Sequence, residues 1–151
     1  MNEREFSTRV RACRDKLWRV SWAILQNGAD CDDALQEALI HAWRHIGALR
    51  EDRYFETWLT RILINACKDI LRRRAKAPHA LPESVAEEAR PEHPELWYAI
   101  RALPVNERIP LVLKYVEGYR IREIAAMLRL PEATVKWRLR SAKQHMRNEL
   151  K

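Results

Sequence analysis

Apolar residues recur every three or four positions through most of the chain, which is the period of an amphipathic helix. The first such stretch predicts a helix that ends near Gly28. A second helix is predicted to begin at the acidic run 30–33, which suits a helix N-terminus, and to stop at Gly47. The apolar positions of the two helices are Phe6, Val10, Cys13, Leu17, Val20 and Ile24, then Leu35, Leu39, Ala42, Trp43 and Ile46.

A third helix over residues 55–74 has the strongest periodicity and ends in the basic run 72–74, which is favourable at a helix C-terminus. Its apolar positions are Phe55, Trp58, Leu59, Ile62, Leu63, Ala66, Ile70 and Leu71. Packing of the three apolar stripes against one another predicts a small helical core.

The C-terminal part also shows a helical period. One helix starts at Leu96 and stops before Pro104, and another covers about 106–117 with Gly118 just after its end. The inward positions of the second are predicted to be Ile109, Val112, Leu113 and Val116. Two further helices, over 121–128 and from Pro131 to about Leu150, are separated by a short turn, which is the form of a helix-turn-helix.

The charge is uneven along the chain of 151 residues, whose 28 Lys and Arg against 21 Asp and Glu give +7. Residues 1–78 have 15 basic and 11 acidic side chains, residues 79–95 have one and five, and residues 96–151 have 12 and five. Residues 78–94, which cover most of this acidic segment, hold four of the seven prolines, a composition typical of a linker. We therefore expect an all-α protein with two small helical domains, 1–77 and 96–151, joined by a flexible acidic linker over 78–95.

Several classes of protein receive little support. A transmembrane helix needs roughly 18 consecutive apolar residues, and no run approaches this, while the N-terminus lacks the apolar core of a secretory signal. We therefore expect a cytoplasmic protein. Cys13, Cys31 and Cys67 form no CxxC motif, and His41 and His45 lack a third metal ligand at convincing spacing. No Gly-rich phosphate loop, HExxH or GxSxG motif indicates catalysis, and we expect neither a cofactor nor a metal.

The last helix has two chemically different faces. Val135, Leu139, Ala142 and Met146 share one, whereas Trp137 lies on the other amid lysines and arginines. An exposed tryptophan among cations favours contact with nucleic acid, because the cations suit phosphates and the centre of the face suits base edges. A charged, solvated helix at the end of a bundle is the alternative.

Two sets of motifs, in order, resemble a known family. Residues 123–125 (EIA) and 130–139 (LPEATVKWRL) resemble the promoter-reading helix-turn-helix of bacterial sigma factors. Residues 33–37 (DALQE) and the spacing of Phe55, Trp58, Leu59, Ile62, Asn65, Asp69, Arg72 and Arg73 resemble their other main domain. The chain is thus similar to the extracytoplasmic-function (ECF) type, which keeps only these two domains.

The resemblance implies three interfaces. Core RNA polymerase, through the β′ clamp helices and with the β subunit as a further partner, would bind one face of the second helix. The −10 promoter element would bind a basic ridge on the third helix and the loop before it, where an unstacked base is held. The −35 element would bind the last helix. The residues implied for polymerase binding are Asp33, Gln36, Glu37, Ile40 and Arg44. Those implied for the −10 element are Arg50, Arg53, Tyr54, Arg61, Asn65, Lys68 and Arg72. Those implied for the −35 element are Thr134, Lys136, Trp137, Arg138, Arg140, Ser141 and Lys143.

Some residues have a plainer interpretation or depart from the family. Phe55 and Trp58 fit the core better than a stacking platform, and Asp69 has a structural alternative as the partner of Arg72 or Arg73. The family usually has Gly where this chain has Arg129 and Ala133, and a small polar residue in place of Trp137, which affects the promoter preference. If Arg129 is left-handed, it costs on the order of 1 kcal/mol relative to Gly.

The family resemblance further implies control by an anti-sigma factor. Two alternatives are a two-domain helix-turn-helix regulator that recruits no polymerase and a helical adaptor that binds only proteins. The first leaves Asp33, Gln36 and Glu37 without a purpose, and the second leaves the basic ridge and the last helix unexplained.

Overall fold

The computed structural model describes residues 1–76 and 94–149, and it contains helices and no strand within those ranges. The chain divides into two compact units, Met1–Glu83 and Ser84–Lys151, here called unit 1 and unit 2. This confirms the expected all-α, two-domain fold. Residues 78–93 of the predicted linker lie outside the described ranges.

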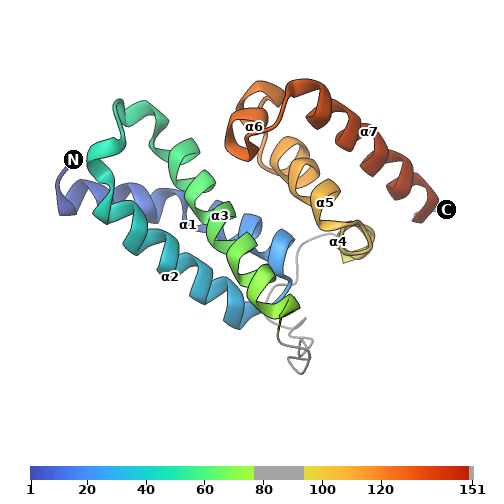
Figure 1. The fold of residues 1–151 in the computed structure, drawn as a ribbon, viewed down its shortest axis with the longest axis horizontal. Coiled ribbons are helices and arrows are strands. Elements are labelled where there is room, and N and C mark those ends of the chain that lie inside the picture. Colours follow the sequence, from blue (N-terminus) through green and yellow to red (C-terminus); the bar gives the residue numbers. More distant parts are fainter. Residues whose placement is uncertain (77–93, 150–151) are drawn as a thin grey trace. The chain divides into compact units, whose positions relative to one another are not determined.

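Unit 1 is built from three packed helices, α1 (Glu3–Leu25), α2 (Gly28–Arg44) and α3 (Phe55–Ala75), each of which contacts the other two (Figure 1). Two 3-10 turns, η1 (Ile46–Ala48) and η2 (Asp52–Tyr54), lie between α2 and α3. Leu17, Leu59 and Leu63 are at most 1% exposed and mark the centre of the core.

The boundary between α1 and α2 differs from the prediction at Gly28. Gln26 is the left-handed residue that ends α1, with a φ of 55° and its N–H bonded to the carbonyl of Trp22 at 2.9 Å. Asn27 then caps α2, since its side-chain oxygen accepts the N–H of Asp30 at 3.0 Å. Gly28 is therefore the first residue of α2, and the acidic run lies inside the first turns.

The buried face of α2 also differs from the prediction. Its fully buried side chains are Cys31, Ala34, Ala38 and Ala42, whereas Leu35 and Leu39 are half-buried and Trp43 is exposed. Small side chains let α1 and α3 approach the α2 backbone closely, so the large apolar residues lie at the edges of the contact. The prediction gave the more hydrophobic leucines more weight than the alanines, so it put the centre of the buried stripe of this helix at the wrong residues.

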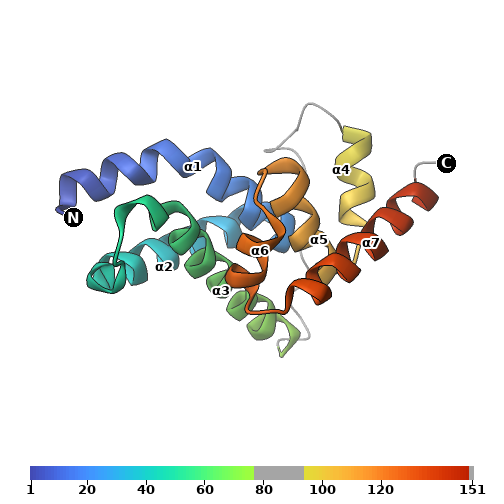
Figure 2. The same ribbon diagram turned by 90° about the horizontal axis from the view of Figure 1, so that it is seen from above.

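Unit 2 contains α4 (Pro94–Arg101), α5 (Val105–Leu111), η3 (Val112–Val116), α6 (Ile121–Leu128) and α7 (Glu132–Glu149). Figure 2 shows α6 followed by α7 after the short turn 129–131, and α7 packs on α4, α5 and α6. The predicted helix-turn-helix is confirmed. α4 begins two residues before the predicted start, at Pro94, which suits the first turn of a helix. Pro131 precedes α7 instead of opening it, and its carbonyl accepts the N–H of Thr134 at 3.0 Å.

The segment after α5 is wider than an α-helix. η3 is a π-helical turn, closed by the N–H of Glu117 on the carbonyl of Val112 at 3.0 Å. The extra residue rotates Val116 outward, and its side chain is exposed, so the prediction that it faces the core is wrong. Gly118 follows with a φ of +79°, the left-handed conformation predicted for a glycine after a helix end.

Candidate functional sites

An exposed polar face runs along α2 on the side away from the core. Asp33, Gln36, Glu37, Ile40 and Arg44 are all exposed and follow one another at helical spacing. The side chain of Ile40 is 53% exposed, which is unusual for an isoleucine unless a partner covers it. The structure thus brings together on one surface the residues predicted to bind polymerase.

Each arginine at the end of α3 is paired with a carboxylate. Arg72 lies 3.0 Å from Asp69, Arg73 lies 3.1 Å from Glu37, and Arg74 pairs with Asp30. The expected pairing of Asp69 with a neighbouring arginine is therefore present, with Arg72 as the partner. Because Arg73 reaches from α3 to Glu37 on α2, it connects the exposed acidic face to the basic end of α3.

Of the remaining ridge residues of α3, Asn65 lines a shallow groove. Asn65 is exposed, and Arg61 and Lys68 are half-buried. The groove between α2 and α3 has a volume of about 210 Å³, and Glu37, His41, Asn65 and Asp69 are among the residues that line it. No pattern in the sequence indicates that His41 faces Asn65 and Asp69, because they belong to different helices.

The loop between α2 and α3 presents Arg50, Arg53 and Tyr54 to solvent, and the Tyr54 side chain is 51% exposed. Within this loop, Arg53 donates to Glu51 at 2.7 Å and lies 4.8 Å from the centre of the Tyr54 ring. Phe55, in contrast, is only 3% exposed, which confirms its assignment to the core.

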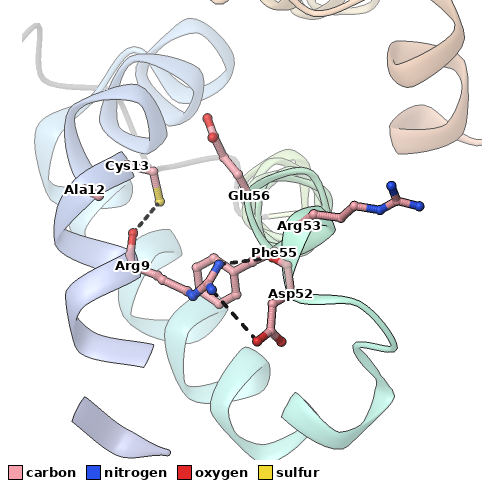
Figure 3. A pocket seen from close by; sticks show the side chains of 7 residues that line it. All are labelled: Arg9, Ala12, Cys13, Asp52, Arg53, Phe55 and Glu56. Carbon is pink, nitrogen blue, oxygen red and sulfur yellow. Dashed lines mark hydrogen bonds and ion pairs between the residues drawn. The ribbon is translucent and has the colours of Figure 1, made fainter. Parts of the chain in front are cut away.

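α1 also contacts this loop, which the sequence interpretation missed. A hollow of about 230 Å³ is lined by Arg9, Ala12, Cys13, Asp52, Arg53, Phe55 and Glu56 (Figure 3). Figure 3 shows the Arg9 side chain crossing from α1 to the turn at Asp52, next to the Phe55 ring. Burial, with a contribution from Glu56, raises the pKa of the Cys13 thiol at the edge of the hollow to about 11. This thiol is therefore protonated and poorly nucleophilic at neutral pH.

The outer face of α7 carries the residues predicted to read DNA. Lys136, Trp137, Arg140 and Lys143 are exposed, with Trp137 exposed at 64%, and Thr134, Arg138 and Ser141 are half-buried beside them. Val135, Leu139 and Ala142 are buried on the opposite side against the rest of unit 2. The structure thus presents a basic surface with a tryptophan at its centre on the second helix of a helix-turn-helix.

Two buried charged residues, Glu107 and Arg108, form contacts between the elements of unit 2. Arg108 donates to the carbonyl of Leu103 at 2.9 Å, and burial lowers its pKa to about 10, so the side chain stays charged at neutral pH. Glu107 lies 2.8 Å from Nδ1 of His145 on α7. These contacts join α5 to the turn that follows α4 and to α7. Sequence reasoning did not identify them, since buried and exposed charges look alike in a basic chain.

The cysteine and histidine side chains of residues 1–76 and 94–149 were also candidates for a metal site. The three cysteines are buried as free thiols, and burial raises the pKa of each. His41 and His45 are stacked 4.2 Å apart, and within the described ranges no three His, Cys, Asp or Glu side chains are grouped to hold a metal ion. No helix in the same ranges is long and apolar enough to cross a membrane.

Comparison with known families and proteins matches both units. The family model described as Sigma-70 region 2 matches residues 9–77, and that described as Sigma-70, region 4 matches residues 93–146. The ECF RNA polymerase sigma factor SigM of Mycobacterium tuberculosis is 36% identical over 93% of this chain and 74% of its own length. The ECF RNA polymerase sigma factor SigW of Bacillus subtilis is 28% identical over 97% of this chain and 89% of its own.

Solved structures have the same fold. The sigma factor RpoE of Bartonella quintana, in complex with the anti-sigma factor NepR, aligns with a TM-score of 0.84 over 97% of this chain and 96% of its own, at 19% identity. CnrH in complex with the cytosolic domain of CnrY aligns with a TM-score of 0.75 over 99% of this chain and 89% of its own, at 25% identity.

Proposed function

Because the chain belongs to the ECF family of RNA polymerase sigma factors, we propose that it acts in the cytoplasm as a regulator and not as an enzyme. It binds core RNA polymerase and directs it to promoters that have the matching −35 and −10 elements. The observation that carries this proposal is the presence of both sigma-factor regions, each with an exposed surface of suitable chemistry.

We assign polymerase binding to the exposed face of α2. Asp33 and Glu37 supply negative charge, Gln36 supplies an amide, and Ile40 supplies apolar surface beside them. A polar rim around an apolar residue is typical of a transient protein interface. Arg44 extends the same face, and the β′ clamp helices are the proposed partner, with the β subunit as a second contact of the factor.

We assign the −10 element to α3 and the loop before it. Arg61, Asn65, Lys68 and Arg72 run along α3 as a polar ridge, which suits a phosphate backbone. Arg50, Arg53 and Tyr54 lie on the loop, where the exposed Tyr54 ring offers a stacking surface for an unpaired base.

We assign the −35 element to the outer face of α7. Trp137 at its centre offers apolar contact with base edges in a major groove. The lysines and arginines around Trp137 are proposed to contact DNA phosphates, and the short polar side chains are proposed to form further hydrogen bonds with the DNA. The proposed contacts are Thr134, Lys136, Trp137, Arg138, Arg140, Ser141 and Lys143.

The proposed domains are residues 1–77 for polymerase and the −10 element, 78–95 as linker, and 96–151 for the −35 element. Promoter elements two helical turns apart are separated by roughly 70 Å of duplex. A linker of this length spans at most about 60 Å when extended. Together with the width of the two domains, it is long enough for both to reach one face of the DNA.

Regulation by an anti-sigma factor is part of the proposal. RpoE of Bartonella quintana is complexed with the anti-sigma factor NepR, and CnrH is complexed with the cytosolic domain of CnrY. The similarity of fold supports an analogous partner here, one that covers the polymerase-binding and DNA-binding surfaces.

Run-off transcription tests the proposed function. Core polymerase with this protein is expected to give promoter-dependent transcripts from a library of native upstream regions, and core polymerase alone is not. The double variant Gln36→Ala, Glu37→Ala is expected to lose transcription through weaker core binding, whereas Asp15→Ala, which removes an exposed acid from α1, is expected to retain it. Failure of every upstream region to give a transcript would exclude a sigma-factor role and favour a regulator that recruits no polymerase.

A further inference from the structure

One side chain of α1 holds the loop that precedes α3. Nη1 of Arg9 donates to the main-chain carbonyl of Asp52 at 3.1 Å, and its Nη2 lies 3.8 Å from the Asp52 carboxylate. The same guanidinium lies 6.0 Å from the centre of the Phe55 ring, which is buried in the core. Arg9 therefore joins α1, the η2 turn and the first residue of α3 at one point (Figure 3).

The contact with Arg9 lies next to the residues of the loop that are proposed to bind DNA. Asp52 directly precedes Arg53 and Tyr54, both exposed and both proposed to contact the −10 element. Other hydrogen bonds described for this part of the loop are local: the N–H of Tyr54 bonds the carbonyl of Glu51 at 3.0 Å, and Arg53 bonds the Glu51 side chain. The N–H of Phe55, the first residue of α3, also bonds the Asp52 carbonyl and so ties the turn to α3. Arg9 adds a link from the same carbonyl to α1.

We propose that Arg9 is a positioning residue for promoter opening, which it assists by fixing the Asp52 turn so that Arg53 and Tyr54 face the unpaired −10 strand. This inference rests on the proposed function of the loop. The carbonyl bond is the principal contact, because it is the shorter of the two and acts on the backbone itself. Arg9 needs no contact with DNA for this effect.

Lys16 provides a matched control on the same helix. Its Nζ lies 2.5 Å from the carboxylate of Glu56, so it also joins α1 to the start of α3. Glu56, however, lies inside α3, whose backbone the helix already orders. Loss of the Lys16 pair therefore removes a link between the same two elements without releasing the loop.

The test uses the full chain assembled with core polymerase on a duplex promoter found by run-off transcription. The readout is the permanganate reactivity of unpaired thymines at the −10 element. Arg9→Ala is expected to lower the fraction of open complexes about three- to tenfold at limiting holoenzyme, the effect of losing one hydrogen bond of typical net strength. Lys16→Ala is expected to stay within about twofold of the wild type. Asp52→Ala, which keeps the carbonyl acceptor, is expected to lie between Arg9→Ala and the wild type.

Two further measurements separate positioning from other roles. Core binding by Arg9→Ala is expected to match the wild type, since the substitution lies away from the α2 face. The salt dependence of binding to a single-stranded −10 oligonucleotide is also expected to keep its slope, because a lost phosphate contact would reduce it by about 0.7.

Three results would overturn the role of Arg9: unchanged opening in Arg9→Ala, an equal loss in Lys16→Ala, or a smaller salt slope in Arg9→Ala. If the wild-type holoenzyme opens no promoter at all, the proposed function fails instead, and this outcome is distinct from each of the three.

Discussion

The left-handed residue at the end of α6 provides the sharpest test of how backbone geometry stabilises unit 2. Arg129 has a φ of 55° and a ψ of 50°, and its N–H bonds the carbonyl of Ala125. A residue with a Cβ pays roughly 1–2 kcal/mol in this conformation, whereas glycine adopts it freely. Arg129→Gly is therefore expected to stabilise unit 2.

The magnitude reflects two opposing effects. Relief of the left-handed conformation favours the variant by about 1–2 kcal/mol, and the greater freedom of glycine in the unfolded chain opposes it by roughly 0.5–1 kcal/mol. Taken at the middle of each range, the net gain is about 0.75 kcal/mol. Because Arg129 is exposed, loss of its side chain is expected to add little to this value.

Gly118 offers the reverse experiment within the same unit. Its φ is +79°, and a Cβ built there meets no atom within 4 Å, so Gly118→Ala changes only the backbone preference. We expect this variant to lose about 0.5–1 kcal/mol by the same reasoning. The two variants thus apply one physical effect with opposite signs.

Hydrogen exchange of the full chain, followed by mass spectrometry without DNA, measures both variants and localises the change to unit 2. Peptides from α5 to α7 that exchange by unfolding of the unit are expected to exchange roughly two- to fivefold more slowly in Arg129→Gly and as much faster in Gly118→Ala. Peptides from α1 to α3 serve as the internal reference. Equal or faster exchange in Arg129→Gly, with the expected change in Gly118→Ala, would refute the reasoning at Arg129.

Three further predictions concern unit 1 and the DNA-reading face. Cys13 has a pKa of about 11 in place of the ordinary 9.0, so in the native protein it is expected to react with iodoacetamide about 100-fold more slowly at pH 8 than an unperturbed thiol. Because the pKa is raised by folding, unit 1 is expected to lose stability as pH rises through the range 9 to 11. Alkylation at the unperturbed rate would contradict the burial of this thiol. A double-mutant cycle on Glu37 and Arg73, measured by urea unfolding, is expected to give a coupling free energy of about 0.2–1 kcal/mol at low salt. This coupling is expected to fall toward zero at high salt. A coupling that does not depend on salt would show that the pair is not a simple exposed ion pair. Trp137→Ala is expected to change the free energy of unfolding by no more than about 0.5 kcal/mol while weakening −35 binding, whereas the buried Leu139→Ala is expected to cost about 2–5 kcal/mol; unchanged −35 binding in the first variant would remove Trp137 from the interface.

The exposed faces of the helices were predicted directly from the sequence. Trp137 is exposed and Val135 and Leu139 are buried because a single helix fixes the direction of each side chain relative to its neighbours. Ile40, which was placed on the predicted polymerase-binding face of the second helix, is exposed for the same reason. Such predictions need only the helical period, because they state which side chains share a face of one helix.

Predictions that depended on the packing partner were less successful. The centre of the α2 contact is formed by Ala34, Ala38 and Ala42. These small residues lie there because the neighbouring helices approach α2 closely. Val116 turned outward because a π-helical turn, which the apolar pattern does not encode, shifted the register. The residue roles at the proposed interfaces stay predictions until they are measured.

The sequence by itself determined the helices, the helix-turn-helix and the basic face of α7, because these depend on contacts between residues close in the chain. Only the tertiary structure decided that Arg73 pairs with Glu37, 36 residues away, and that Arg9 holds the turn at Asp52, 43 residues away. In a chain with 28 Lys and Arg and 21 Asp and Glu, each charge has many possible partners. The packing of the three helices of unit 1 brings these particular pairs within reach, and that packing is set by the small side chains buried between them.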